Sequence, residues 1–426
     1  MSATLLAGVA RRTISPPKGI YLIGYGDRLW GNRGLHDHLT ATALTLDDGQ
    51  TRATVVACDL LAINEHTVAR VQAEVGENVL ICCSHTHSGP IVYADRHSPR
   101  RNRRYVHFLV TQLVEVIRDS QANLQPVSLA WGAGQAHISL NRRERKPDGS
   151  IEIGVNPTGK IDPSLGVVQV KTHTGPPLAH LVNFACHNVV LGPKNLLVSA
   201  DWAGAMRRRV EAETGVPLLF IQGTTGDLNP NHAWGEDDWE AVERLGGQVA
   251  DQVTKTLDHL TPFQAAPVIF ASTDVWLPLE AVAQTRESPP TYRDVLSEIA
   301  KLPPFLVDPI LNRRYPWKST LEARGGVWSI PMKLNLLKAG EWALVALGME
   351  VFNEIGLAIK ASSPVLHTMV ASVSNGCIGY LPTAAEHALG GYEVDIAPYF
   401  YRLPGRLTSE CEAITLDSVQ NLLALS

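Results

Sequence analysis

The sequence predicts an α/β fold in which helices cover both faces of a mixed sheet. Strand-like and helix-like segments alternate through most of the chain, which is typical of such folds. The strand-like segments are apolar, β-branched and bounded by turn residues. The 426 residues are 45% hydrophobic, which is enough for a large core. Because no internal repeat, low-complexity run or Ser/Gly linker marks a boundary, we expect one domain over residues 1–426.

The first half of the chain predicts strands separated by two amphipathic helices. Apolar residues recur at helical spacing in Glu65 to Val75 and in Tyr105 to Ser120, so both segments are predicted helices. The predicted strands of this half are Thr40 to Leu46, Ala53 to Leu61, Asn78 to Cys83, Val127 to Ser139, Gly166 to Thr172 and Leu178 to Ala185.

The second half continues the alternation. Asp201 is a good N-cap for a helix that Gly215 ends. Further helices are predicted at Asp237 to Leu257 and Phe352 to Ala361, and strands at Pro217 to Gln222, Ile330 to Leu337, Trp342 to Leu347 and Met369 to Ser374. The Pro- and Arg-rich segment from Glu280 to Trp328 departs from this pattern. We interpret it as an excursion from the core and as a candidate cover for a site.

Charge and composition exclude several classes of function. The formal net charge of −5 argues against broad nucleic-acid binding. No apolar run reaches the roughly 18 residues of a membrane span, and the first residues lack the pattern of a signal peptide. Six cysteines in so long a chain are no disulfide framework. They are typical of small buried residues in a reducing compartment, so we expect a cytoplasmic protein.

The sharpest local motif is Ser84-His85-Thr86-His87-Ser88-Gly89-Pro90, directly after a predicted strand. Residues two apart in an extended chain point to the same side, so His85 and His87 project together from a strand end. Two imidazoles with this placement suit a divalent metal. A hydrogen-bonded histidine pair that caps a turn is the alternative.

Two further segments place polar residues at strand ends. His187 follows the predicted strand that ends at Ala185, and Asp201 beyond it is either a partner that fixes an imidazole tautomer, a helix N-cap, or both. The loop from Ile221 to Asn231 contains Asp227 and Asn229 and suits either a substrate cradle or an ordinary solvated turn. It is not a phosphate-binding P-loop, because no Gly-Lys-Ser/Thr follows.

The last candidate residues lie in the C-terminal third. Glu350 comes between a predicted strand and a predicted helix, so it is either a metal ligand or a favourable charge at the helix N-terminus. Tyr380 lies in a Gly-rich turn and Tyr392 follows twelve positions later; each on its own is most often a packed ring with a satisfied hydroxyl.

These segments, in this order, resemble the catalytic domain of the neutral/alkaline (non-lysosomal) ceramidases. The start of the chain, with Thr13-Ile-Ser-Pro-Pro17 and Gly24-Tyr-Gly, also resembles that family, and the resemblance extends from about Ala7 to Glu393. It implies a ceramidase-like catalytic-domain fold and one zinc ion per chain. The zinc ligands implied by position are His85, His187, Glu350 and Tyr380.

The resemblance also implies roles for other residues. His87 lies beside the metal and serves proton transfer, while Arg142 and Tyr392 act near the scissile carbonyl. Asp227 and Asn229 stand where the family contacts substrate, although Asn229 replaces a serine of the family. The family's C-terminal β-sandwich domain has no counterpart before Ser426.

The function expected from this resemblance is zinc-dependent hydrolysis of an amide bond in an N-acyl amine such as ceramide. Zinc with an open position lowers the pKa of bound water to about 7, which suits hydrolysis near neutral pH. The alternatives are the same site acting on a small soluble amide, lactam, lactone or ester, and a non-catalytic metal-binding protein. The sequence leaves open the substrate, a homo-oligomer, a second metal ion and the choice among first-row divalent metals.

Overall fold

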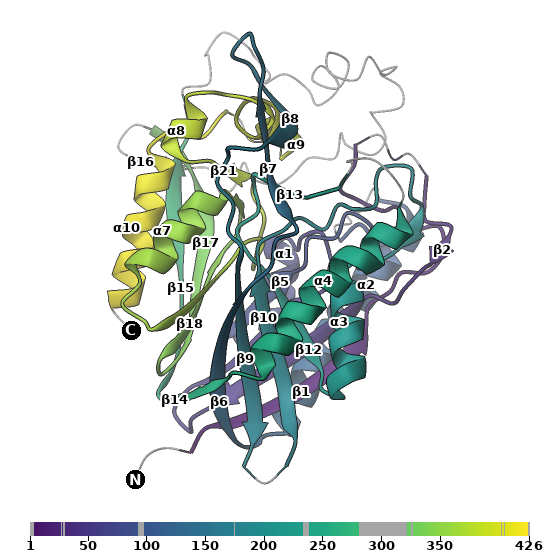
Figure 1. Cartoon of the computed structure of the whole chain (residues 1–426), viewed down its shortest axis with the longest axis vertical. Helices are drawn as coiled ribbons and strands as arrows, with labels where there is room; N and C mark the ends of the chain where they lie inside the picture. Colours follow the sequence, from purple (N-terminus) through teal and green to yellow (C-terminus); the bar gives the residue numbers. More distant parts are fainter. Residues whose placement is uncertain are drawn as a thin grey trace.

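The computed structural model describes residues 4–26, 28, 30–92, 98–173, 175–232, 238–280, 322–324, 327–401, 403 and 405–424. Within these residues the strands form a nine-stranded sheet, a five-stranded sheet and three smaller sheets. Helices lie on the outside of the two large sheets (Figure 1). The predicted mixed α/β architecture is therefore confirmed. The helices cover the outer faces of two packed sheets rather than the two faces of one.

The nine-stranded sheet has the order β12-β10-β9-β6-β1-β3-β4-β5, with β14 beside β6. It is mixed, because β4 pairs with β5 and β10 with β12 in parallel, while the other pairs are antiparallel. The strands are β1 (Leu6–Thr13), β3 (Thr40–Asp47), β4 (Arg52–Cys58), β5 (Val79–Cys83), β6 (Gln125–Gln135), β9 (Ser164–Thr172), β10 (Pro177–Phe184), β12 (Leu218–Gln222) and β14 (Thr261–Phe263).

The five-stranded sheet has the order β15-β17-β18-β20, with the short β16 beside β17. Only β18 and β20 run parallel. Its strands are β15 (Val268–Pro278), β16 (Glu322–Arg324), β17 (Val327–Ala339), β18 (Trp342–Leu347) and β20 (His367–Ala371).

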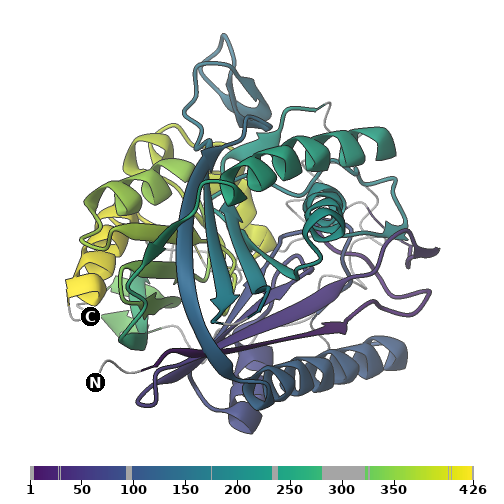
Figure 2. The same ribbon diagram turned by 60° about the horizontal axis from the view of Figure 1, so that its bottom comes forward.

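Three pairs of longer helices cover the sheets. Helix α2 packs on β1 and β3 of the nine-stranded sheet and α4 packs on β6 and β9, so the two helices lie over different parts of its outer face (Figure 2). Helices α7 and α10 lie on the five-stranded sheet. The pairs are α1 (Glu65–Val75) with α2 (Arg100–Ala122), α3 (Asp201–Thr214) with α4 (Trp239–Leu257), and α7 (Asn353–Ser362) with α10 (Cys411–Ala424).

The parallel-paired strands β5 and β12 are buried on both faces, so their sequences are almost continuously apolar. In β5 all residues are buried, and Ile81 faces α1 and α2 whereas Leu80 faces the other sheet. In β12, Leu218 likewise packs under α3 and α4, and Leu219 belongs to the core between the sheets. Each such side chain stabilises the fold by about 1.5–3 kcal/mol relative to an exposed one.

Smaller elements gather at the end of the molecule that holds the candidate site. The strand predicted from Val127 to Ser139 is interrupted: β6 ends at Gln135 and a new strand, β7, begins at Ser139. The remaining elements are β2 (Gly34–Leu35) with β11 (Leu197–Val198), β7 (Ser139–Arg145) with β8 (Ile151–Asn156) and β13 (Leu228–Pro230), β19 (Glu350–Val351) with β21 (Tyr380–Leu381), α8 (Ala384–His387), the π-helix η2 (Tyr392–Ile396) and α9 (Ala397–Phe400).

The predicted excursion falls mostly outside the described residues, which omit 281–321. Its described end joins the five-stranded sheet, where β16 pairs with the start of β17 and Leu279 donates to the carbonyl of Trp328. A cover over the site therefore stays a prediction, and so does a single domain over 1–426.

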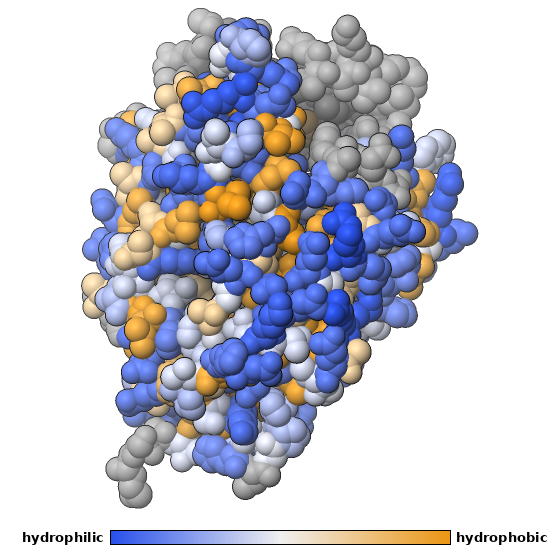
Figure 3. All heavy atoms as spheres, viewed as in Figure 1, coloured by the Kyte–Doolittle hydropathy of each residue, from blue (hydrophilic) through white to orange (hydrophobic). Residues whose placement is uncertain are grey.

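The surface is mixed in character. On the face seen in Figure 3, hydrophobic side chains occur in small groups among hydrophilic ones. Large exposed apolar side chains include Trp30 and Leu366, at 71% and 72% exposure. None of the helices in the described part of the chain combines the length and apolar character needed to cross a bilayer.

Candidate metal centre

The carboxyl ends of parallel strands converge at the candidate site. His85 follows β5, His187 follows β10, and Glu350 follows β18. The loop after β12 lies between them, because Thr225 and Leu228 contact His187 and Gly226 donates to the carbonyl of Val351. Polar residues at this edge of a sheet do not disturb the apolar core, which is why ligand sites of α/β folds occur there.

His85 is held from both its backbone and its ring. Its φ of 64° is in the left-handed region, where non-glycine residues are uncommon. The backbone N–H donates to Leu60, and ring Nδ1 lies 2.7 Å from the carbonyl oxygen of Leu61. Since a carbonyl accepts, Nδ1 donates to it, and this hydrogen bond directs Nε2 into the site.

His187 is oriented in the same way by different partners. Its Nδ1 lies 2.8 Å from the carbonyl oxygen of Thr225 and 2.9 Å from that of Leu228. Nε2 is buried and has no hydrogen-bond partner within the part of the chain that the structure describes. Burial lowers the pKa of His187 to about 4, so the ring is neutral at neutral pH, as a metal ligand requires.

The predicted role of Asp201 in fixing this ring is wrong. The Asp201 carboxylate instead accepts hydrogen bonds from the backbone N–H groups of Val190, Leu191 and Trp202. Its expected place as N-cap is also wrong by one residue, since Ala200 occupies that position and Asp201 begins α3. Asp201 acts on the site only indirectly, by holding the backbone just after His187.

Glu350 faces both histidines. Its Oε2 lies 3.2 Å from Nε2 of His85 and 3.4 Å from Nε2 of His187, and its Oε1 accepts a hydrogen bond from Tyr401. Burial alone would raise the pKa of Glu350, but the facing imidazoles hold it well below its usual value. The sequence left Glu350 as either a metal ligand or a favourable charge at a helix N-terminus. Because its carboxylate faces the two histidines, Glu350 stays a candidate ligand.

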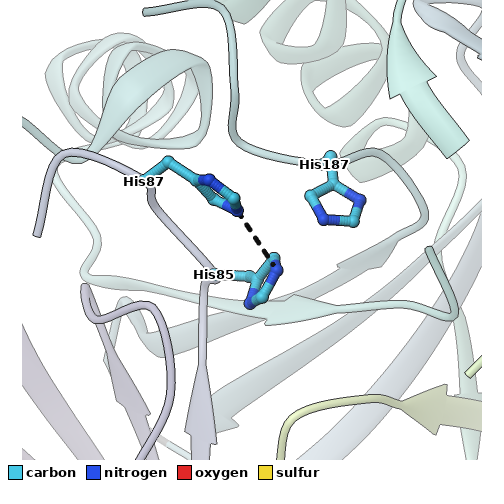
Figure 4. A group of neighbouring side chains, drawn as sticks. All are labelled: His85, His87 and His187. Atoms are coloured by element: carbon cyan, nitrogen blue, oxygen red, sulfur yellow. Dashed lines mark hydrogen bonds between the residues drawn. The ribbon is translucent and has the colours of Figure 1, made fainter. Parts of the chain in front are cut away.

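These donors fit a divalent metal ion. Figure 4 shows the rings of His85, His87 and His187 gathered around one space, and their ligand atoms lie within 4.8 Å of one another. His187 Nε2 and Glu350 Oε2 are buried polar atoms that form no hydrogen bond with described residues. Such orphaned atoms are costly unless something else satisfies them. Imidazole nitrogens with a carboxylate and a phenol oxygen suit zinc, among other first-row metals.

Tyr380 brings the fourth predicted donor to this centre. Strand pairing sets it beside Glu350, and its hydroxyl accepts a hydrogen bond from Arg142 Nη2 at 3.1 Å. Burial and the Glu350 carboxylate raise the pKa of Tyr380 well above its usual value, although Arg142 opposes this. A bound cation would favour the phenolate.

His87 lies beside the other two histidines, with ring centroids 5.0 Å from His85 and 5.6 Å from His187. Its Nε2 is 3.4 Å from that of His85 (Figure 4). The Tyr25 and His87 rings pack edge to face, with centroids 5.0 Å apart. Burial, together with His85 and His187, lowers the pKa of His87 well below its usual value. The geometry suits either a third imidazole ligand or a neutral proton acceptor, so the predicted division of roles stays a prediction.

Arg142 is fixed by three partners. Nε donates to Glu393 at 2.8 Å, Nη1 to Asn229 at 3.3 Å, and Nη2 to Tyr380. A register irregularity between Asn141 and Arg143 in β7 allows Arg143 to reach the same carboxylate, 2.6 Å from Glu393 Oε2. Of the five N–H groups of the Arg142 guanidinium, two remain for other acceptors.

The other predicted residues also lie at this centre. Tyr392 begins η2, with its ring 5.9 Å from that of Tyr380. Asn229 orients Arg142, as described above. Asp227 is buried and accepts hydrogen bonds from Asn353 and Asn141, so its carboxylate joins α7 to β7. Burial raises the pKa of Asp227 to about 7. Substrate contact by Asp227 or Asn229 stays a prediction.

Sequence reasoning missed Tyr401, Glu393 and Gly24. Tyr401 contacts Glu350 from 51 residues away, and Glu393 contacts Arg142 from 251 residues away, so no local pattern indicates either pair. Gly24 offers a weak signal, as part of Gly24-Tyr-Gly. Its φ is +114°, and an added Cβ would lie 2.6 Å from the ring of His87.

The fold and site together match a known family of proteins. The family model described as "Neutral/alkaline non-lysosomal ceramidase, N-terminal" matches residues 6–259, more than half of the chain. The chain therefore belongs to the neutral/alkaline non-lysosomal ceramidase family.

Individual relatives are distant. The neutral ceramidase of Pseudomonas aeruginosa is 22% identical over 87% of this chain and 66% of its own length. Neutral ceramidase B of Dictyostelium discoideum is 24% identical over 50% of this chain and 33% of its own length. The chain thus spans less than two thirds of these relatives.

The crystal structure of the P. aeruginosa neutral ceramidase matches all of this chain and 75% of its own, with a TM-score of 0.76 at 18% identity. A structure titled "Ceramidase complexed with C2" matches 99% of this chain and 75% of its own, also with a TM-score of 0.76 at 18% identity. At such identity the matches show a shared fold.

Proposed function

We propose that this protein is a zinc-dependent hydrolase that cleaves the amide bond of an N-acyl amine such as a ceramide. The observation that carries the proposal is the convergence of the His85 and His187 Nε2 atoms with Glu350 Oε2 in a buried site. The names of the relatives, which are neutral ceramidases, support the choice of an amide substrate.

In this proposal His85, His187, Glu350 and Tyr380 hold one zinc ion. Bound zinc supplies Lewis acidity and water with a pKa of about 7. The charges of the ligand set are compatible with this role, because His187 is neutral and Glu350 is held ionised. Arg142 stabilises an anionic Tyr380 oxygen from 3.1 Å.

The remaining residues would move protons and orient the carbonyl group. Neutral His87 can accept a proton from water and return it to the leaving amine, which is general acid–base work suited to an imidazole. The Tyr392 hydroxyl and the unused N–H groups of Arg142 are the donors proposed for the carbonyl oxygen, whose negative charge grows during the reaction.

Two wider expectations stay proposals as well. All six cysteines are free, which supports a reducing, cytoplasmic location. A homo-oligomer also stays a proposal.

The decisive experiment pairs the metal content of the purified protein with hydrolysis of a substrate panel. The panel contains a fluorescent ceramide, short N-acyl amines, lactams and lactones. About one zinc per chain with turnover of N-acyl amines is the expected result. Zinc with turnover of lactams or lactones alone would retain the site but replace the substrate class. Absence of any metal, and of activity after metal addition, would overturn the proposal.

A further inference from the structure

Tyr401 contacts the metal centre without belonging to the predicted ligand set. It follows α9, and its hydroxyl donates a hydrogen bond to Glu350 Oε1. The Tyr401 ring packs edge-on against Tyr380, with centroids 6.1 Å apart. One side chain therefore contacts two of the four proposed ligands.

The two carboxylate oxygens of Glu350 contact different partners. Oε2 faces Nε2 of His85 and of His187, at 3.2 and 3.4 Å. Oε1 is turned to the Tyr401 hydroxyl. A carboxylate with one oxygen held by a donor cannot rotate freely, so its other oxygen stays aimed at the histidines.

We propose that Tyr401 is a positioning residue that fixes the Glu350 carboxylate for zinc binding, an inference that rests on the proposed function. Hydrogen-bond partners of metal ligands generally set ligand orientation and basicity, and their loss weakens metal affinity or activity by 10–100-fold. The Tyr401 hydroxyl is the hydrogen-bond partner of Glu350. The backbone carbonyls of Leu61 and Thr225 are the corresponding partners of His85 and His187.

The hydroxyl, rather than the ring, is the part of Tyr401 that this role requires. Among the described residues, the sulfur of Cys377 also lies near this hydroxyl, at 3.5 Å, and a thiol is a weak acceptor. A carboxylate is a much stronger acceptor, so Glu350 is the preferred partner. Packing against Tyr380 needs only an aromatic ring, which phenylalanine retains.

The test measures zinc affinity directly, by competition between the protein and a chromophoric chelator. Tyr401→Phe should weaken zinc binding by about 10–100-fold. Tyr105→Phe is the control, because Tyr105 likewise donates its hydroxyl to a protein oxygen, the carbonyl of Ile14, but in a different core cluster; Tyr105 is buried, whereas Tyr401 is partly buried. This control should bind zinc as the wild type does. Thermal unfolding of each metal-free protein reports whether the variants fold.

Each outcome has a separate meaning. Wild-type protein that binds no zinc would overturn the proposed function itself. If the wild type binds zinc and Tyr401→Phe binds it equally well, the role of Tyr401 is wrong while the proposed function stands. Equal weakening by Tyr105→Phe would also overturn that role, because it would reflect a general loosening of the fold.

A variant that does not fold is informative as well. If Tyr401→Phe alone fails to fold, the double variant with Glu350→Gln replaces the buried carboxylate by a neutral amide. Recovery of folding in the double variant would show that Tyr401 acts through Glu350. Failure of the double variant would show that Tyr401 supports the fold instead, and would overturn the proposal.

Discussion

At the scale of single residues, the centre depends on how each imidazole is held. Backbone carbonyls fix Nδ1 of His85 and of His187, so both rings direct Nε2 inward. The Nδ1 atom of His87 has no such partner in the described structure. This difference supports the proposal that His85 and His187 are ligands and that His87 transfers protons.

The difference predicts distinct losses for two alanine variants. His85→Ala should lose both bound zinc and activity, because it removes an oriented ligand. His87→Ala should keep about one zinc per chain and lose turnover by about 10²–10⁴-fold, the usual contribution of a general acid or base. Metal analysis and turnover measured on the same samples make the comparison. An empty site in His87→Ala would mean that His87 is a ligand.

Glu393 gives a second prediction at this scale. It is 1% exposed in its side chain and lies between Arg142 and Arg143. Glu393→Gln would remove the carboxylate paired with the buried Arg142, whereas Arg143 keeps its ion pair with Glu386, so the free energy of unfolding should fall by about 3–5 kcal/mol. Denaturant unfolding measures the loss.

The matched control is Glu354→Gln. Glu354 is also an acidic partner of a basic residue, but its partner Lys160 is 72% exposed. Solvent screens this pair, so the variant should unfold at nearly the wild-type denaturant concentration. An equal loss of unfolding free energy in both variants would show that burial of the Glu393 ion pairs does not increase their contribution to stability.

At the scale of elements, the sequence predicted what depends on local pattern. Helices such as Glu65–Val75 and buried strands such as Val79–Cys83 appear close to their predicted bounds, because periodicity and turn residues encode them. The sequence did not predict β7 and β8, whose polar residues carry no clear alternation with apolar ones. Those strands exist because β7 pairs with β13 beside the site.

The site residues, too, could be predicted from local sequence only in part. Strand-end positions made His85, His187 and Glu350 candidates, but only the family resemblance joined them with Tyr380 into one ligand set. The partners that hold them, among them Tyr401 and the carbonyl of Thr225, arise from contacts between elements far apart in the chain. Such contacts leave no trace in the spacing of a single sequence.

The segment before β2 contains Gly24, whose contact with the His87 ring gives a prediction at the scale of elements. Gly24 packs on the His87 ring at a φ of +114°, so Gly24→Ala both strains the backbone and displaces that ring. We expect turnover to fall by about tenfold or more, the usual effect of a small misplacement, while zinc content is unchanged. Turnover and metal content measured together check this.

The control for Gly24→Ala is Gly76→Ala. Gly76 has a φ of +100° and ends α1, and nothing lies within 4 Å of an added Cβ. Both variants carry the strain of a positive φ, but only Gly24→Ala meets His87. If both lower turnover equally, backbone strain rather than displacement of His87 is the cause.

At the scale of the whole molecule, two sheets packed face to face bring distant strand ends together. The shared core contains Leu219 of one sheet and Leu344 of the other, and the site lies at the carboxyl ends of β5, β10 and β18. The geometry of the candidate metal centre therefore depends on the stability of both packed sheets. Anything that unfolds the nine-stranded sheet also separates His85 from Glu350.

His180 makes that stability depend on pH. It lies in β10, 2% exposed, and its Nδ1 has no hydrogen-bond partner among the described residues. Burial lowers the pKa of His180 to about 4, although Glu211, which is paired with Arg11, opposes the shift. Since the unfolded chain has a histidine pKa of about 6.5, it binds a proton between pH 6.5 and 4 that the folded protein rejects.

The sign follows from that difference in bound protons. Stability from neutral His180 is complete above pH 6.5 and is lost as the pH falls toward 4, by roughly 2 kcal/mol at pH 5 and 3 kcal/mol in all. Urea unfolding of the metal-free protein at pH 7.5 and 5 measures this loss. His180→Leu should remove about 2 kcal/mol of the wild-type pH dependence, whereas His173→Leu, on the exposed turn after β9, should keep it. Equal pH dependence in wild type and His180→Leu would mean that burial of His180 does not couple the sheet to protons.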